Sequence, residues 1–140
     1  MVGERAVDLP LRNGQCVRVD EVEFMLALRV EFPALADELN DETWRGLVHL
    51  EASCLARHTR QAIDAGDEHE VQRCFDFVRL AWMAGDDAVC NALAVSYVEH
   101  LNFDDCKVRR SWAFDLLAPV LRQVAVELGA APNKPTRERR

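Results

Sequence analysis

The sequence predicts an all-α protein, a bundle or a short solenoid-like stack of about five antiparallel helices. The main observation is a feature that occurs twice in residues 62–101: Gly66-Asp67 and Gly85-Asp86 each follow an apolar run with helical spacing. Glycine can end a helix in the left-handed conformation, and the following aspartate can accept hydrogen bonds from the N–H groups that open the next helix. We therefore expect three consecutive helices, with both aspartates as caps and positive φ at, or beside, both glycines.

The first part of the chain divides at Asp20. Residues 1–19 form either a hairpin around Asn13-Gly14 or an irregular arm, and the sequence leaves both open. Asp20 and Glu23 resemble a capping box and open the first helix. A row at helical spacing follows and ends at Pro33, with one further turn expected over residues 34–39; the row consists of Val22, Met25, Leu26, Arg29 and Phe32.

Four more helices are expected. The second helix begins near Asn40 or Asp41 and continues to Ala65. The third and fourth, residues 67–84 and 86–102, are apolar on most sides and so form the core. The fifth begins within residues 107–111, ends at Gly129, and is kinked or broken at Pro119. The organisation is an N-terminal arm (1–19), a helical domain (20–129) and a disordered tail (130–140).

Composition excludes several classes of protein. The five cysteines are an odd number and form no Cys-x-x-Cys pair, which argues against a disulfide scaffold or a zinc ribbon. No apolar run could span a bilayer and no signal peptide is evident, so we expect a cytoplasmic protein with no membrane partner. A net charge of −7 disfavours nucleic-acid binding. No phosphate loop, His-Glu-x-x-His or Gly-x-Ser-x-Gly motif is present, so no catalytic residue and no cofactor is predicted.

The negative charge is concentrated near the N-terminal end of the helical domain. Residues 20–42 hold eight acids and a single base, Arg29. Such a surface fits a basic protein partner, or serves only for solubility, and the pattern leaves both open. The candidate partner-binding residues are Asp20, Glu21, Glu23, Glu31, Asp37, Glu38, Asp41 and Glu42.

Glu51 and His58 are the sharpest local signal, because both fall on the apolar side of the second helix, two turns apart. A buried carboxylate needs a partner, and the fourth helix offers Asn91, Ser96, Glu99 and His100. One interpretation is a polar pocket formed by Glu51, His58, Asn91 and Glu99 that does acid–base chemistry. The other is a satisfied structural network, or a glutamate whose carboxylate reaches the edge. Cys54 and His58 could share a metal, but no second close pair supports one, so no metal site is predicted.

Several stretches resemble an uncharacterised family of small bacterial helical proteins, known only as a domain of unknown function. They are Phe32-Pro33-Ala34-Leu35, Ala65-Gly66-Asp67, residues 75–82 and residues 89–99. The resemblance covers residues 20–128 and provides no catalytic residues. Proteins of this general kind are often immunity partners encoded beside bacterial toxins. We therefore expect a non-enzymatic, immunity-type binding protein that neutralises a basic toxin. The alternatives are a small enzyme or ligand-binding protein around Glu51 and His58, and a homo-oligomeric structural subunit such as a homodimer.

Overall fold

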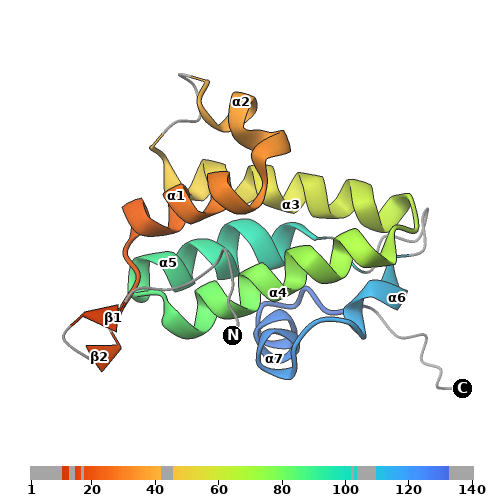
Figure 1. Ribbon diagram of the computed structural model, residues 1–140. Coiled ribbons are helices and arrows are strands. Elements are labelled where there is room, and N and C mark those ends of the chain that lie inside the picture. Colours follow the sequence, from red (N-terminus) through yellow and green to blue (C-terminus); the bar gives the residue numbers. More distant parts are fainter. Residues whose placement is uncertain are drawn as a thin grey trace, which may run out of the picture.

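The computed structural model describes residues 11–12, 15–16, 18–41, 46–101, 103 and 110–132. It confirms the all-α class: α1, α3, α4 and α5 lie side by side, with α6 and α7 across the far side (Figure 1). The helices in chain order are α1 (Glu21–Glu31), η1 (Pro33–Leu35), α2 (Ala36–Leu39), α3 (Val48–Asp64), α4 (Glu68–Ala84), α5 (Asp87–Ala92), η2 (Leu93–Tyr97), η3 (Val98–His100), α6 (Ser111–Phe114) and α7 (Pro119–Glu127).

The chain before Asp20 contains a small hairpin, so of the two alternatives for this region the hairpin is the one observed. Strand β1 (Leu11–Arg12) pairs antiparallel with β2 (Gln15–Cys16). Val19 then leads into α1, where the capping box is confirmed: Asp20 Oδ1 accepts from Glu23 N at 2.8 Å, and Asp20 N donates to Glu23 Oε1 at 3.1 Å.

Helix α1 packs against the bundle with only part of the predicted row, because Met25 and Phe32 contact the core but Val22 and Leu26 do not. Phe24 and Leu28 are buried, whereas Val22 and Leu26 are 61% and 59% exposed. Both pairs are spaced four residues apart, so helical periodicity alone cannot choose between them. The larger Phe24 ring is the one that enters the core, where it lies 5.9 Å from the ring of Phe77.

Helix α3 starts later than the sequence indicated, and the predicted start at Asn40 or Asp41 is wrong. The chain makes the short helix α2 first. Gly46 then has φ +79°, and Leu47 is extended, so helical geometry begins only at Val48. Residues 42–45 lie outside the described part of the chain. Nine residues of α3 are buried, including the polar Glu51 and Thr59, which makes this helix as central as the two that were predicted to form the core.

The turn between α3 and α4 confirms the first Gly-Asp prediction. Gly66 has φ +72°, its N–H donates to Ile63 O at 3.0 Å, and Asp67 N donates to Ala62 O at 2.9 Å. This pair of bonds is the Schellman arrangement, which satisfies the last carbonyl groups of a helix. Asp67 then caps α4 by accepting from Glu70 N at 3.1 Å.

The turn between α4 and α5 corrects the second prediction. Asp86 does cap α5, accepting from Val89 N at 3.0 Å, but Gly85 has φ −72° and ψ 153°, an extended conformation open to any residue. Packing, rather than φ, requires a glycine at this position, because a Cβ atom there would lie 2.6 Å from both Ala81 O and Val89 Cγ1. Val19 pairs with this turn through two backbone hydrogen bonds of 2.8 Å, which attach the N-terminal segment to the bundle.

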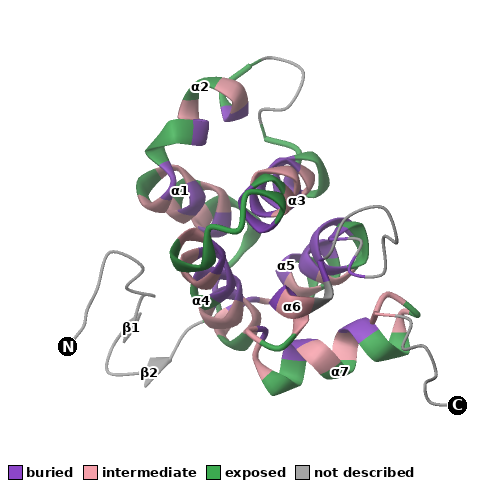
Figure 2. Cartoon of the chain, turned by 90° about the vertical axis from the view of Figure 1, so that its right-hand side faces the viewer, coloured by how far each residue is buried: buried purple, intermediate pink, exposed green. Residues whose placement is uncertain are grey.

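The predicted fourth helix is one continuous path whose hydrogen bonding changes along its length. It runs as α5, then as the π-helical segment η2, then as the 3₁₀ turn η3. Helix α3 packs on both α4 and η2, and Figure 2 shows buried residues concentrated where these elements face one another. Leu55, Cys74 and Tyr97 are fully buried there.

The predicted fifth helix is broken at Pro119, as its sequence indicated. Residues 111–114 form α6, and Pro119 is the first residue of α7, where a missing N–H costs nothing. Gly129, at φ +73°, ends α7. Residues 133–140, the greater part of the predicted disordered tail, lie outside the described residues. Among the residues that are described, no helix combines the length and the apolar character needed to cross a membrane.

Candidate functional site

An apolar row faces solvent along α1. Val22, Leu26 and Val30 are 61%, 59% and 64% exposed, and their spacing of four residues aligns them along one side of the helix. We call these three residues the α1 stripe. A helix normally buries its apolar stripe against the rest of the fold, and α1 already does so with Phe24 and Leu28, so the α1 stripe is an additional apolar surface.

The predicted acidic residues that the structure describes lie on or beside α1 and α2, and they do not form one uniform charged face. Asp20, Glu21, Asp37 and Asp41 are exposed, while Glu23, Glu31 and Glu38 are half-buried. The carboxylate of Glu31 lies 3.3 Å from Arg73 and that of Glu38 pairs with Arg57, whereas Asp20 and Glu23 hold the start of α1. Glu42 lies outside the described residues. Glu21 and Asp37 are thus the exposed acids best placed to meet a partner.

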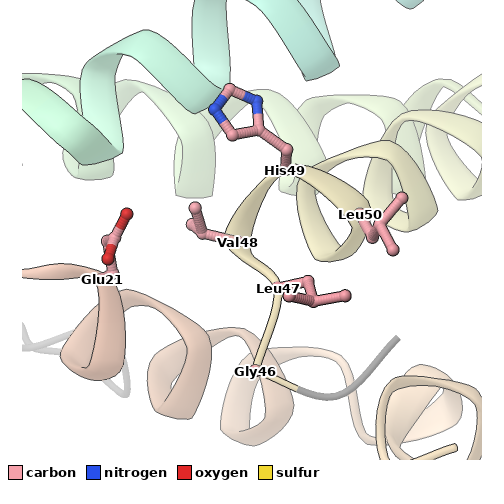
Figure 3. A pocket seen from close by; sticks show the side chains of 6 residues that line it. All are labelled: Glu21, Gly46, Leu47, Val48, His49 and Leu50. Atoms are coloured by element: carbon pink, nitrogen blue, oxygen red, sulfur yellow. The ribbon is translucent and has the colours of Figure 1, made fainter. Parts of the chain in front are cut away.

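A shallow groove of about 420 Å³ opens between the start of α1 and the start of α3. Its side chains are mainly apolar, with a carboxylate on the α1 side and an imidazole on the α3 side, as Figure 3 shows. Leu47 and Leu50 are 52% and 37% exposed at its edge. The lining residues are Glu21, Gly46, Leu47, Val48, His49 and Leu50.

His49 connects this groove to the π-helical segment. Its Nδ1 lies 2.7 Å from Ser96 Oγ, and Ser53 Oγ donates to the backbone carbonyl of Ser96 at 3.4 Å. π-Helical turns are frequent at functional sites, and a serine beside a histidine is one arrangement for a nucleophile. A third group that would orient the imidazole is absent from the described part of the chain, so we interpret the contact as structural.

Glu51 is fully buried, and its partner is Arg29. The two form a bidentate pair, with Arg29 Nη1 2.7 Å from Oε1 and Nη2 2.9 Å from Oε2, and Gly46 N donates to Oε2 at 2.9 Å. The same contact raises the pKa of Arg29 above its ordinary value. The other guanidinium donors go to Met25 O, Leu39 O and Asn40 Oδ1 at 2.8–2.9 Å. All five N–H groups of the guanidinium are used, and the Glu51 carboxylate is shielded from solvent.

The structure therefore does not bring together the four residues of the predicted polar pocket, Glu51, His58, Asn91 and Glu99. Glu51 is occupied by Arg29, His58 pairs with Glu70 on α4, and Asn91 and Glu99 are exposed. The partner of Glu51 lies on α1 and not, as expected, on the fourth helix. The available signal was Arg29, the only base among residues 20–42 and a member of the row at helical spacing on the first helix.

His58 belongs to a second polar cluster, at the edge of the contact between α3 and α4. Its Nε2 lies 2.7 Å from Glu70 Oε2, and Arg73 donates to both oxygens of Glu70, at 3.1 and 2.9 Å. Phe32 packs against both side chains, with its ring centroid 5.8 Å from that of His58 and 4.4 Å from the guanidinium of Arg73. Burial alone would raise the pKa of Glu70, but the hydrogen bonds from Arg73 and His58 outweigh it and lower that pKa.

Cys74 completes this cluster from the buried side. The metal-binding atoms of His58, Glu70 and Cys74 all lie within 4.8 Å of one another, and burial raises the pKa of the Cys74 thiol to about 12. Cys54, considered with His58 from the sequence, is not part of this group. Its sulfur accepts from Arg57 at 3.7 Å, and burial, with the nearby Glu38 carboxylate, raises its pKa to about 11.

Comparison with known proteins identifies the family. A family model described as a domain of unknown function, DUF7674, matches residues 25–129, which is well over half of the 140-residue chain. No curated protein and no solved structure is similar enough to the chain to count as a match. The matched span runs from the first helix to the glycine that ends α7, so it includes α3, α4 and both polar clusters. The chain therefore belongs to the DUF7674 family, the uncharacterised family that its sequence resembles.

Proposed function

We propose that this protein is a cytoplasmic, non-enzymatic binding protein that uses the α1 stripe and the adjoining acids to bind a basic protein partner. The specific form of the proposal is a bacterial immunity-type protein that neutralises a basic toxin. The observation that carries it is the exposure of Val22, Leu26 and Val30 within the most acidic segment of the chain.

The α1 stripe favours a protein partner on energetic grounds. Each of its side chains is about three-fifths exposed, and covering them would contribute on the order of 1 kcal/mol apiece. Large apolar side chains at a spacing of four on an exposed helix are typical anchors for binding in a partner's groove. The apolar groove beside Glu21 offers a second contact, where a lysine or arginine of the partner could bury its aliphatic stem and place its charge at the carboxylate.

The charge of the chain favours a basic partner over a second copy. Glu21 on α1 and Asp37 on α2 are exposed, and the whole chain carries −7. A symmetric dimer through α1 would bring these acids together, which opposes association. The alternative of a ligand pocket at Glu51 has less support, because Arg29 and Gly46 already occupy that carboxylate.

The test uses the basic protein encoded beside this gene, since an immunity protein is encoded next to its target. Glu21→Lys with Asp37→Lys should slow association several-fold at low salt and remove its salt dependence, because peripheral charges act mainly by steering. Leu26→Ser with Val30→Ser should instead speed dissociation at least about tenfold. Val120→Ser with Val126→Ser, two exposed valines of α7, is the matched control and should change neither rate. Binding kinetics measured on immobilised protein give all these values.

Two outcomes would overturn the proposal. The first is unchanged kinetics in both sets of α1 variants, since the face would then be only a solvated surface. The second is a wild-type homodimer in light scattering that Leu26→Ser with Val30→Ser converts to monomer, because a second copy of the chain would then be the occupant of the α1 stripe.

A further inference from the structure

We propose that His58, Glu70 and Cys74 form a zinc-binding site. The three residues come from two neighbouring helices: His58 from α3, and Glu70 and Cys74 from successive turns of α4, four residues apart. One imidazole nitrogen, one carboxylate oxygen and the thiol sulfur lie within 4.8 Å of one another. This inference concerns other residues than those of the α1 stripe and does not rest on the proposed function.

The donor set is that of zinc. Nitrogen, oxygen and sulfur together suit a borderline metal with no geometric preference, whereas Mg²⁺ and Ca²⁺ prefer oxygen alone. Glu70 as a carboxylate and Cys74 as a thiolate supply two negative charges against the two positive charges of the ion, so the ion and its three ligands together carry no net charge. Neutrality matters here because Cys74 is fully buried, where an unbalanced charge is costly.

Neighbouring side chains already hold two of the ligands in place. Arg73 Nε donates to Glu70 Oε1 at 3.1 Å, and the other carboxylate oxygen, Oε2, faces His58 Nε2 and also accepts from Arg73 Nη2 at 2.9 Å. The ring of Phe32 packs against the His58 imidazole at an interplanar angle of 67°, which restricts its rotation. Hydrogen-bonded carboxylates and packed imidazoles of this kind are the usual support for metal ligands.

The cluster is accessible to an ion from solvent. The side chains of His58 and Glu70 are 23% and 20% exposed, and Cys74 lies behind them. Three protein ligands leave the fourth tetrahedral position to water. Nε2 and Oε2 are 2.7 Å apart, and bonds of ordinary length to zinc would require them to separate by about half an ångström.

Binding must release protons, and their origin can be stated. The Cys74 thiol, whose pKa is about 12, loses its proton to solvent as the Zn–S bond forms. His58 Nε2 gives up the hydrogen that it shares with Glu70, either to Nδ1 or to solvent, as the Zn–N bond forms. Zinc affinity should therefore rise with pH and binding should release at least one proton per ion.

The experiment uses the full chain, stripped with a chelator and titrated with Co²⁺, then with Zn²⁺. We expect a thiolate-to-cobalt charge-transfer band with the intense visible bands of four-coordinate cobalt, both removed by one equivalent of Zn²⁺ and unaffected by Mg²⁺. Cys74→Ser should abolish the charge-transfer band and weaken Zn²⁺ binding by at least about a hundredfold, beyond the loss usual for supporting residues. Cys54→Ser, the same change at a buried thiol of α3, is the matched control and should leave both unchanged.

A second variant keeps the test decisive if Cys74→Ser does not fold. His58→Gln alters only a partly exposed ligand, and Zn²⁺ should raise the midpoint of thermal unfolding in the wild type but not in this variant. Far-UV circular dichroism of each metal-free variant checks the fold. The proposal fails if the wild type shows no thiolate-to-cobalt band, or if the band survives both Cys74→Ser and His58→Gln. In either case the three residues form only an ion-pair and packing cluster.

Discussion

Two arginine–carboxylate pairs brace α3 at its two ends, and they have the same geometry in different surroundings. Near the first turn, Arg29 contacts both oxygens of Glu51 at 2.7 and 2.9 Å. At the last residue, Arg110 contacts both oxygens of Asp64 at 2.8 Å. Glu51 is fully buried, whereas the Asp64 side chain is 35% exposed.

The difference between the two pairs lies in what would replace a lost partner. If Arg29 were removed, the buried carboxylate of Glu51 would lose its counter-ion, and an unpaired buried charge is strongly destabilising. If Arg110 were removed, solvent would hydrate Asp64, so little would be lost. Equal distances therefore correspond to unequal energies, and the surroundings of the pair decide its contribution to stability.

The largest effect expected from this comparison is at Glu51. Glu51→Leu should lower the free energy of unfolding by about 3–5 kcal/mol, because it leaves the Arg29 guanidinium without its counter-ion. The double variant Arg29→Met with Glu51→Leu should recover much of this loss, since a buried pair can often be replaced by apolar side chains. Urea denaturation of the two single variants and the double variant measures both values.

A double variant as unstable as Glu51→Leu alone would contradict this account. It would mean that the hydrogen bonds from Arg29 to the backbone of Met25 and Leu39, which connect α1 with α2, contribute more to stability than the charge pair does.

An intermediate effect is expected at Thr59, which lies between the two pairs and is buried but uncharged. Its hydroxyl donates to Leu55 O at 2.9 Å and lies 2.9 Å from the hydroxyl of Tyr97. Burial holds the pKa of Tyr97 well above its ordinary value, so Tyr97 keeps its proton and donates it to Thr59. Thr59→Val should cost about 1–3 kcal/mol in urea denaturation, because a buried O–H is then left without an acceptor.

Tyr97→Phe provides the control for this middle position. Combined with Thr59→Val it removes both members of the bond, and the double variant should be more stable than Thr59→Val alone. If Tyr97→Phe instead lowers the free energy of unfolding of the Thr59→Val variant as much as it lowers that of the wild type, the two hydroxyls contribute independently. The bond between them then has no net effect.

The sequence predicted the features of this fold that depend on neighbouring residues. The capping box at Asp20, the caps at Asp67 and Asp86, the left-handed Gly66 and the break at Pro119 are all set within one turn of chain. Each follows from the conformational preference of a single residue type, so no knowledge of the rest of the molecule was needed.

The remaining features depend on contacts between distant segments. Glu51 was recognisable as a polar residue on an apolar face, but its partner is 22 residues earlier, on a helix with two apolar sides. Gly85 was recognisable as part of a turn, but a glycine is needed there because Ala81 and Val89 leave no room for a Cβ atom, and not because of φ. His58, Glu70 and Cys74 meet only once α3 and α4 are packed. Helical periodicity gives the angle of a side chain around its own helix and does not give the neighbour that it faces.

The smallest effect is expected at Asp64, and its sign depends on pH. The hydrogen bonds from Arg110 lower the pKa of Asp64 below its ordinary value of 3.8, against a smaller opposing effect of burial. The pair therefore stabilises the fold fully above pH 3.8, and this contribution is lost as the pH falls below that value. Because Asp64 is over one-third exposed, solvent screening limits the contribution at neutral pH to less than about 1 kcal/mol.

Asp64→Asn should be slightly less stable than the wild type at pH 7 by urea denaturation, and the difference should shrink towards zero below pH 3.8. Arg110→Met removes the hydrogen bonds that lower the pKa of Asp64. In that background, Asp64→Asn should change the free energy of unfolding at neutral pH by less than it does in the wild type. A loss of several kcal/mol in Asp64→Asn would make the two ends of α3 energetically alike and would contradict the role assigned here to solvent.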